Sequence, residues 1–546
     1  MISRRKFFQI SGAAALVGAG GAAWMYFGGD RFNAASAAPI RPYPFDPIRP
    51  ENFQQKLFIP GSSGPFGVMD VAGPMQIRAT AASFPILNGQ SSPFLMYQTE
   101  QAGKAFQNPI FRIESGTRFK ATLNNELPEP TIIHWHGLHT PAAMDGQPVN
   151  TIGAGARFDY DFTVSNRGGT YWYHTHAHEL TAKQAYNGLA SFFLVDDEDQ
   201  RALNKALDLR LGETDVPLVI QDKRFDGAGR LTYQPNMQDT MMGFLGDVIL
   251  ANLTPNAYLN VTPRLYRFRL LNGSNARIYR LAFVKGGTLL NFAVIGTDGG
   301  LLDQPQTTTE AFLAPGERLD VVFDVGQAQP GEDVFLRSLA FDTMENEGSA
   351  GNMGGMMGGM GGMGGMSSSR LPLGAEFNVL KLSVTQGERS TPQLPAKLSE
   401  IRTIPTEGVP ERKIELSMGH MRFLINGRSF RMHEIAFEVK RGAVEIWRIS
   451  NASVGMPHPM HIHGFSFQVV ERLNSPRQIS ANARFGRGRT VSDLGWKDTV
   501  LVWPGETVKI AIDFSHDFTG SQSYLLHCHN LEHEDAGMMV NFRVTA

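Results

Sequence analysis

Histidine is confined to two short stretches of this 546-residue chain, and that clustering constrains the fold more than any other feature of the sequence. Four His-x-His pairs stand out, in the strings HWH, HTH, HPMHIH and HCHNLEH. On a β-strand, residues i and i+2 point to the same face, roughly 7 Å apart along the strand. A fold that brings the four pairs together therefore surrounds one cavity with eight imidazoles. The histidines are His134, His136, His139, His174, His176 and His178, then His420, His433, His458, His461, His463, His516, His527, His529 and His533.

The only cysteine of the chain, Cys528, narrows the chemistry of such a cavity. Imidazole is a preferred ligand of zinc, copper, iron and nickel. Because Cys528 stands between two histidines, strand alternation points its sulfur to one face and His527 and His529 to the other. A metal on Cys528 would then be joined through two residues of backbone to metals on the opposite face.

The residues after Cys528 predict one particular metal. His533 and Met538 follow at intervals of five and ten residues. A cysteine with two histidines and a weakly held methionine is the ligand set of a blue-copper electron-transfer site. The second histidine must come from elsewhere in the chain, and His458, the first of HPMHIH, is the candidate. A zinc site is a poorer interpretation, because tetrahedral zinc takes four ligands and the chain supplies about twelve.

The N-terminus is typical of an export signal. The string SRRKFF at 3–8 resembles the twin-arginine motif, the apolar stretch 10–27 is short for a membrane span, and ASA at 35–37 is a plausible cleavage site. We therefore expect a twin-arginine signal peptide over 1–37, the twin-arginine translocase as a partner during export, and a periplasmic protein without stable membrane insertion. An uncleaved membrane anchor is the alternative. A lone thiol in an oxidising compartment is reactive unless a metal occupies it, and the net charge of -2 gives no indication of nucleic-acid binding.

The sequence after the N-terminal signal predicts an all-β protein with three domains. Short alternating runs broken by Gly, Pro, Asn and Asp are typical of β-sandwiches or Greek-key barrels. The expected domains are 45–197, 205–387 and 400–546, and the His-x-His pairs lie in the first and third, so the second would be a spacer. Within it, residues 353–366 read MGGMMGGMGGMGGM, a segment that cannot bury a core.

The motifs HWHG, YWYHTHAHE, HPMHIHG and HCHNLEHEDAGMM resemble the four copper motifs of the multicopper oxidases. The strings LLNGSNARIYRLAF and LAPGERLDVVFDV resemble that family's middle domain, so the resemblance covers nearly the whole mature chain. It implies three consecutive cupredoxin domains, which are Greek-key β-sandwiches. It also implies that electrons pass singly from a reducing substrate through a type 1 copper to a trinuclear cluster, where O2 is reduced to water.

Carried over residue by residue, the resemblance implies four copper ions. Type 1 copper would be held by His458, Cys528, His533 and, axially, Met538. Type 2 copper would be held by His134 and His461, and the type 3 pair by His136, His174, His176, His463, His527 and His529. The histidines outside this pattern are expected at the surface or behind the ligands; they are His139, His178, His420, His433 and His516.

Two carboxylates are candidate catalytic groups beside the electron-carrying Cys528. Reduction of O2 consumes protons, so acid groups are needed near the cluster. Asp145, eleven residues after His134, matches the family's acidic residue near the type 2 site. Glu534, directly after His533, matches the proton-delivering glutamate of the bacterial copper-efflux oxidases. The alternative for each is a solvated or turn carboxylate.

The electron donor is less well determined by the sequence. The methionine-rich segment favours Cu(I), because soft thioethers select that ion. Bacterial cuprous oxidases carry such an insert in this part of the chain, and they also use a Met and an Asp just before the first type 1 histidine. Here Met456 matches the Met, but Val454 replaces the Asp. The candidate ligands of substrate copper are Met353, Met356, Met357, Met360, Met363, Met366 and Met456.

We expect a cuprous oxidase with side activity on phenols and a role in copper tolerance, and three alternatives stay open. The first is a laccase acting mainly on phenols or aromatic amines. The second is a copper-sequestering or copperless structural protein of the same fold, against which the complete ligand set argues. The third, a copper nitrite reductase, fits the His-x-His pairs less well than a trinuclear cluster does.

Overall fold

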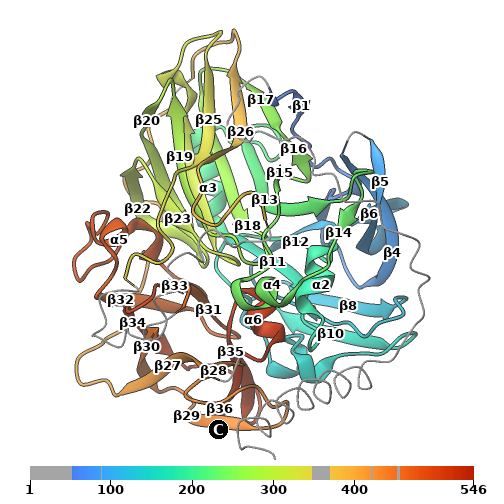
Figure 1. Ribbon diagram of the computed structural model, residues 1–546, viewed down its shortest axis with the longest axis vertical. Coiled ribbons are helices and arrows are strands. Elements are labelled where there is room, and N and C mark those ends of the chain that lie inside the picture. The colour runs from blue at the N-terminus through green and yellow to red at the C-terminus, as the bar shows by residue number, and fades with distance from the viewer. Residues whose placement is uncertain (1–51, 88, 347–368, 391, 420–421, 452–454) are drawn as a thin grey trace, which may run out of the picture. The chain divides into compact units, whose positions relative to one another are not determined.

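The predicted alternation of short strands is realised as six β-sheets that form three pairs, each pair enclosing a core of its own (Figure 1). The computed structural model describes residues 52–546 except 88, 347–368, 391, 420–421 and 452–454. The predicted signal peptide, the methionine-rich segment, His420 and Val454 lie outside the described residues. Among the described residues, no helix combines the length and the apolar character that crossing a membrane requires.

The first pair of sheets carries two His-x-His pairs and packs around Phe119, Trp135 and Tyr173. One sheet has the strand order β10-β8-β4-β5-β6-β2 and the other β3-β7-β12-β11-β9. In β8, buried and more exposed residues alternate, as expected for a strand with one face on a core. The strands are β2 (Gly64–Pro65), β3 (Val68–Asp70), β4 (Met75–Leu87), β5 (Gln90–Gln101), β6 (Lys104–Gln107), β7 (Ile110–Glu114), β8 (Arg118–Asn125), β9 (Ile133–His134), β10 (Arg157–Thr163), β11 (Gly169–Thr175) and β12 (Ala190–Asp196).

The second pair of sheets contains a strand that is buried throughout its length. Every residue of β18 is buried, including Arg267 and Arg269, whose guanidinium groups pair with Asp320 and Asp215. Buried charges of this kind need partners, which these carboxylates supply. The strands are β13 (Asp215–Phe225), β14 (Leu231–Thr232), β15 (Val248–Ala251), β16 (Thr254–Pro255), β17 (Ala257–Val261), β18 (Leu265–Asn272), β19 (Tyr279–Lys285), β20 (Thr288–Leu290), β21 (Phe292–Thr297), β22 (Gly300–Thr308), β23 (Ala311–Leu313), β24 (Arg318–Asp324), β25 (Asp333–Ser338) and β26 (Phe377–Val384).

One short strand near the N-terminus joins this second pair instead of the first. Strand β1 (Gln55–Lys56) runs parallel to β17, and Leu57 is buried in the second core. The expected first domain, 45–197, therefore includes residues that add an edge strand to its neighbour. The domain boundaries themselves stay a prediction.

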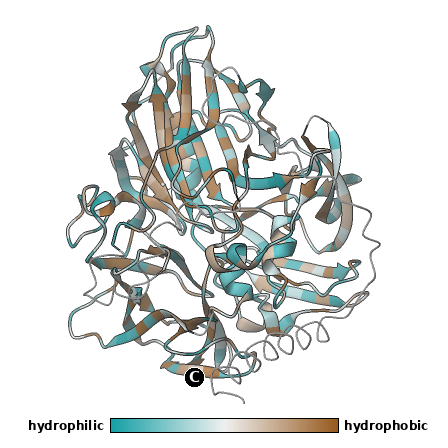
Figure 2. Cartoon of the chain, viewed as in Figure 1, coloured by the Kyte–Doolittle hydropathy of each residue, from teal (hydrophilic) through white to brown (hydrophobic). Residues whose placement is uncertain are grey.

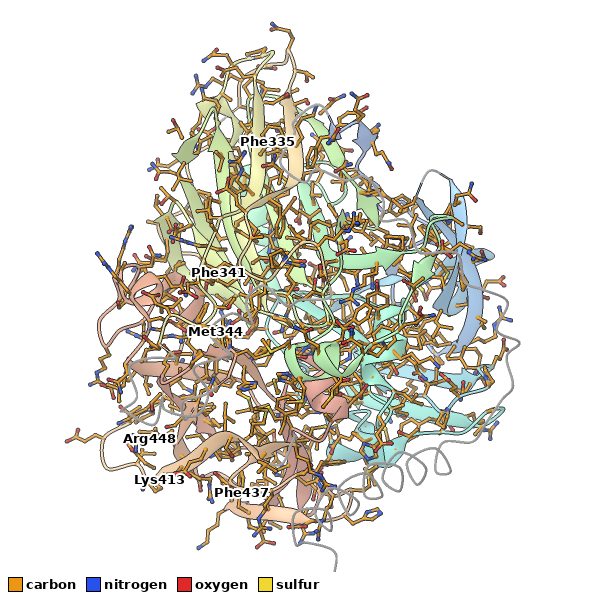
Figure 3. All side chains as sticks on the ribbon, viewed as in Figure 1. Phe335, Phe341, Met344, Lys413, Phe437 and Arg448 are labelled. Carbon is orange, nitrogen blue, oxygen red and sulfur yellow. The ribbon has the colours of Figure 1, made fainter. Side chains whose placement is uncertain are left out.

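The third pair of sheets holds the remaining two His-x-His pairs and Cys528. Its core includes Trp447 and Phe542, and Phe437, labelled in Figure 3, packs against both rings. Apolar residues recur along these strands, where Figure 2 shows brown and teal segments alternating. The strands are β27 (Glu411–Gly419), β28 (Arg422–Ile425), β29 (Ile435–Lys440), β30 (Val444–Asn451), β31 (His458–Ile462), β32 (Phe467–Leu473), β33 (Thr499–Val502), β34 (Thr507–Asp513), β35 (Gln522–Cys528) and β36 (Met539–Thr545).

Three of the short helices meet where the pairs of sheets adjoin (Figure 1). Helix α6 contacts both α2 and α4, and each of the three follows strands of a different pair. Helix α3 connects the first pair to the second and begins at Asp197, whose side chain accepts a hydrogen bond from Gln200 N. The helices are α2 (Thr181–Tyr186), α3 (Glu198–Leu207), α4 (Met237–Met242), α5 (Arg477–Ser480) and α6 (Leu531–Asp535), with 3-10 turns η2 (Ala142–Met144), η3 (Pro148–Asn150), η4 (Val325–Gln327) and η6 (Val491–Asp493).

Candidate metal centres

Strand register brings the four His-x-His pairs into one buried cluster, called the eight-histidine cavity below, between the first and third pairs of sheets. In the first pair, β11 runs antiparallel to β9 and places His174 opposite His134. In the third, β31 runs antiparallel to β35 and places His461 opposite His527. The second member of each pair lies just beyond the end of its strand and joins the same cluster of ring nitrogens. All eight side chains are at most 1% exposed.

Within this cavity, the ring nitrogens gather in three groups of three. In each group, one nitrogen from every residue lies within 4.8 Å of the others. His136 and His461 also stack face to face, with ring centroids 3.7 Å apart. The groups are His134, His136 and His461; His136, His174 and His529; and His176, His463 and His527.

Hydrogen bonds outside the cavity fix which nitrogen of each ring faces inward. The Nδ1 atom of His134 donates to the backbone oxygen of Asp145 (2.9 Å), and that of His174 donates to Thr175 O (2.7 Å). His461 Nδ1 donates to Asp498 O (2.8 Å) in the same way. These rings therefore turn Nε2 and its lone pair into the cavity.

His136 is held in the opposite sense. Its Nε2 lies 2.9 Å from Asp498 Oδ1, whereas its Nδ1 lies 3.4 Å from His174 Nε2. The carboxylate makes Nε2 the protonated atom, so Nδ1 carries the lone pair that faces the cavity. His136 is thus an Nδ1 ligand candidate among rings that present Nε2.

The inward nitrogens approach one another too closely to be explained by hydrogen bonding alone. His463 Nε2 and His527 Nε2 are 3.0 Å apart, and both rings use Nδ1 as the donor, toward Asp145 Oδ2 (2.7 Å) and Cys528 O (3.1 Å). The two facing atoms are therefore both acceptors. In addition, neither nitrogen of the buried His529 has a hydrogen-bond partner among the described residues. Convergent lone pairs and orphaned buried nitrogens are what a set of metal ions would satisfy.

A second, separate group lies in the core of the third pair of sheets. Cys528 Sγ is 3.5 Å from His458 Nδ1 and 3.8 Å from His533 Nδ1, and these two nitrogens are 3.3 Å apart. Met538 shares this core with Cys528, and its backbone oxygen accepts a hydrogen bond from Cys528 N (3.0 Å). Met539, by contrast, lies opposite His527 in the β35–β36 ladder. The structure therefore brings one thiol and two imidazoles together, with Met538 in the same core.

Cys528 connects the two groups because its neighbours point the other way. Its side chain belongs to the core of the third pair, while His527 and His529 line the eight-histidine cavity. Burial raises the pKa of the Cys528 thiol, so a metal must displace its proton before the sulfur can bind as thiolate. The alternation predicted from the sequence HCH is thus present in the backbone.

Burial lowers the pKa of imidazoles in both groups. Desolvation lowers the pKa of His176 and of His458 from 6.5 to about 4. For His134 and His463, burial and then the neighbouring imidazoles lower the pKa well below its ordinary value. At neutral pH these rings are uncharged, which is the form that binds a metal ion.

Both predicted carboxylates are fully buried at the cavity. Asp145 Oδ2 accepts a hydrogen bond from His463 Nδ1 (2.7 Å), and burial raises the pKa of Asp145 well above its ordinary range. Glu534 lies between two rings, with Oε1 3.4 Å from His176 Nδ1 and Oε2 3.3 Å from His527 Nδ1. Burial alone would raise the pKa of Glu534, but these two imidazoles outweigh it and lower the pKa. The two acids therefore stand on different sides of the cavity with oppositely shifted pKa values.

Two residues beside the cavity, Asp498 and Arg318, were not predicted from the sequence. Asp498 contacts His136 and His461, and the Arg318 guanidinium pairs with Asp498. Asp498 is an ordinary member of the string GWKDTV, and Arg318 begins β24 in the second pair of sheets. Arg318 lies in the string LAPGERLDVVFDV, but nothing in either string places the two residues together, because their proximity depends on the packing of three pairs of sheets.

The other described histidines lie outside the two groups, although His139 and His516 are largely buried. His139 Nδ1 donates to Gly464 O (2.6 Å), and the His516 ring stacks on Phe518. His178 is partly exposed and His433 is exposed. Met456 is buried, and its sulfur lies 3.9 Å from the side-chain nitrogen of Asn530, which in turn lies 3.3 Å from His533 Nε2.

Comparison with known proteins gives a consistent picture. Two family models, both described as multicopper oxidase, match residues 394–546 and 96–200. The crystal structure of the multicopper oxidase McoA from Aquifex aeolicus is similar to this chain with a TM-score of 0.77 and 39% identity, over 90% of this chain and 100% of that one. The laccase of Bacillus subtilis strain 168 is 32% identical over 448 residues, or 77% of this chain and 81% of the laccase. The cell division protein FtsP of Xenorhabdus nematophila is 29% identical over 537 residues, or 98% of this chain and 97% of that protein.

Proposed function

The chain belongs to the multicopper oxidase family, and from this premise we propose that it couples the one-electron oxidation of Cu(I) to the four-electron reduction of O2 to water. The observation that carries the oxidase is the pairing of a Cys528 group with an eight-histidine cavity through adjacent residues. When bound, copper at the Cys528 group would supply one-electron transfer, and copper in the eight-histidine cavity would supply the reduction of O2. We propose four copper ions, with the ligands assigned above from the family motifs.

The protein itself limits where electrons can reach the Cys528 group. His533 is fully buried, its Nε2 donates to Met241 O (3.1 Å), and its ring stacks on Phe423. Cys528 and Met538 are also fully buried. Of the proposed type 1 ligands, His458 alone retains exposure, at 6%. We therefore propose that donors deliver electrons at the edge of His458.

This narrow access favours a small soft donor over a bulky phenol. Met456 is two residues from His458 and only 3% exposed, and its thioether contacts Asn530, whose side-chain nitrogen lies beside His533. A thioether in this position suits Cu(I), which soft ligands select. The methionines of 353–366 would supplement it as collectors of substrate copper. A role in copper tolerance follows, since conversion of Cu(I) to Cu(II) removes the more readily thiol-bound ion.

Protons for O2 reduction would come through the two buried acids. The raised pKa of Asp145 favours its protonated form beside His463 and His134. Glu534, which adjoins His176 and His527, would receive and pass protons on the other side of the cavity. Each acid acts at a ring nitrogen that faces away from the cavity, so neither competes with the metal for a lone pair.

We further propose a periplasmic location reached by the twin-arginine route. The support is the SRRKFF motif with its apolar stretch and the single cysteine. Replacing Arg4 and Arg5 by Lys should leave the protein in the cytoplasmic fraction. Export that is unchanged in this variant would refute the route.

Oxygen uptake by the copper-loaded protein tests the donor. Cu(I) and a simple phenol are compared in the wild type, in a variant lacking residues 353–366, and in Met456→Leu, with Met69→Leu as the matched control in a distant buried position. We expect Met456→Leu and the deletion to raise KM for Cu(I) and leave phenol oxidation unchanged. A better rate with phenol, together with unchanged use of Cu(I) in both variants, would instead identify a laccase.

The non-catalytic alternative makes a different prediction. A copper-sequestering protein would bind copper at the methionine-rich segment without consuming O2, and a copperless structural protein would bind none. The relation to FtsP keeps this class in view. The full set of ten histidines, one cysteine and one methionine at the described sites argues for copper binding and turnover.

A further inference from the structure

Arg318 occupies a position that joins all three pairs of sheets beside the eight-histidine cavity. It is fully buried at the start of β24, in the second pair of sheets, which supplies none of the proposed copper ligands. Its Nε donates to Thr170 O of β11 (3.0 Å) in the first pair. Its two terminal nitrogens both reach Asp498, which precedes β33 in the third pair.

Every donor of this guanidinium has a partner. Besides Thr170 and Asp498, Nη1 donates to Gly316 O (2.8 Å) and Nη2 donates to Asp298 O (3.0 Å). A guanidinium carries five N–H donors in a rigid plane, so five matched acceptors fix its position and orientation. Arg318 therefore holds the Asp498 carboxylate in one geometry.

Asp498 in turn contacts two of the cavity histidines with different atoms. Its Oδ1 accepts from His136 Nε2 (2.9 Å), and its backbone oxygen accepts from His461 Nδ1 (2.8 Å). His136 comes from the first pair of sheets and His461 from the third, and the two rings stack on each other. Asp498, with the Thr499 hydroxyl 3.3 Å and 3.2 Å from the same two nitrogens, thereby sets the inward atom of both rings, Nδ1 for His136 and Nε2 for His461.

The surroundings leave little freedom for this arrangement to change. A Cβ atom on Gly137, the residue after His136, would lie 2.4 Å from Asp498 Oδ2 and 2.8 Å from Arg318 Nη2. Lys497, beside Asp498, is buried and pairs with Asp298 and Glu317 of the second pair of sheets, both at 2.9 Å. The segment that carries Asp498 is thus anchored to the second pair on two consecutive residues.

We propose that Arg318 and Asp498 form a positioning unit through which the second pair of sheets sets the geometry of the His136 and His461 copper ligands. The hydrogen bonds of Arg318 go to Asp498 and to backbone oxygens, so it acts by orienting Asp498. This inference rests on the proposed copper ligands and is independent of which donor the enzyme oxidises. The second pair of sheets is then more than a spacer, because it supplies the charge that fixes the ligand rings of the other two.

The test measures copper binding and its spectrum, with no requirement for turnover. Arg318→Met, Arg318→Lys and Asp498→Asn are each loaded with copper, and Arg277→Met is the matched control. Arg277 is also fully buried in the second pair, but its partners are Asp222, Gly246, Leu371 and Pro372, none of which contacts Asp498. Copper content, chelator competition, the blue absorption and the electron paramagnetic resonance of the type 2 copper are recorded.

We expect Arg318→Met to weaken type 2 copper binding by about 10- to 100-fold, the usual effect of losing a partner behind a ligand. The blue absorption should be unchanged, because the Cys528 group lies apart from Arg318 and Asp498. Arg318→Lys, which keeps the charge but offers three donors, should lie between Arg318→Met and wild type. Arg277→Met should lower thermal stability and leave the type 2 spectrum as it is.

Two results would overturn the proposal. One is a type 2 spectrum and affinity in Arg318→Met that equal those of Arg277→Met. If Arg318→Met does not fold, the same result in the nearly isosteric Asp498→Asn and in Arg318→Lys would overturn it equally. A wild-type protein that binds no copper in the cavity would instead refute the proposed function.

Discussion

The copper-free protein should lose folding stability as the pH falls, because its buried imidazoles resist protonation. In the folded chain, burial holds the pKa of His176 and His458 at about 4, compared with 6.5 for an exposed imidazole. Between these two pH values the unfolded chain binds protons that the folded chain does not. Stability is therefore complete above about pH 6.5 and is lost as the pH falls toward 4.

The size of this loss of stability follows from the same two pKa values. A tenfold change in proton affinity is worth about 1.4 kcal/mol, so each of these two histidines costs about 2 kcal/mol between pH 7 and pH 5 and about 3 kcal/mol once the pH is below 4. Two such groups remove about 4 kcal/mol at pH 5, a large part of the stability of an ordinary domain. The other cavity histidines whose pKa burial lowers act in the same direction.

Urea unfolding of the copper-free protein at pH 7, 6 and 5 provides the assay. The midpoint should fall steadily with pH, and His458→Leu should remove about 2 kcal/mol of that dependence because it removes one buried base. His433→Leu, at an exposed position, is the control. The copper-loaded protein should resist acid better, since copper stabilises the folded state that binds it. A copper-free midpoint that does not change between pH 7 and 5 would refute the reasoning.

Three further substitutions test the site itself. Cys528→Ser should abolish both the blue absorption and oxygen uptake, because it removes the only thiolate and the residue that joins the two groups; retained turnover would overturn the ligand assignment. Glu534→Gln should slow steady-state oxygen reduction by about 100-fold or more while anaerobic reduction of the blue site stays near the wild-type rate, and stopped-flow spectroscopy separates the two steps. Gly316→Ala should lower Tm and reduce copper binding at His529. Gly316 has φ +83°, which costs another residue about 1–2 kcal/mol, and a Cβ there would lie 2.9 Å from the His529 ring. An unchanged copper content would contradict this prediction.

The sequence was most informative where strand alternation acts directly. The string HCH predicts that Cys528 points away from His527 and His529, and this is what the structure shows. In each His-x-His pair, however, the strand includes only the first histidine, and the second lies just beyond its end. The short alternating runs likewise predict the all-β architecture, which the structure and its similarity to multicopper oxidases confirm. These features depend on residues close in sequence.

Features that depend on packing between distant segments could not be predicted. The hydrogen bond from His533 goes to the backbone carbonyl of Met241, and any residue type at position 241 would offer the same acceptor. The pairing of Arg318 with Asp498 spans residues from two pairs of sheets, and an arginine at the start of a strand is ordinarily interpreted as solvent-exposed. The different inward nitrogen of His136 follows from the same pairing.

The division of the cavity between the first and last pairs of sheets also has a consequence for the order of events in the cell. His134, His136, His174 and His176 leave the ribosome long before His461, and every strand of the second pair of sheets except β1 is synthesised in between. A nascent or C-terminally truncated chain thus offers half a cavity, with its four imidazoles open to whatever ions are present. Copper could fill the cavity only after synthesis has passed His529 and the third pair of sheets has folded against the first.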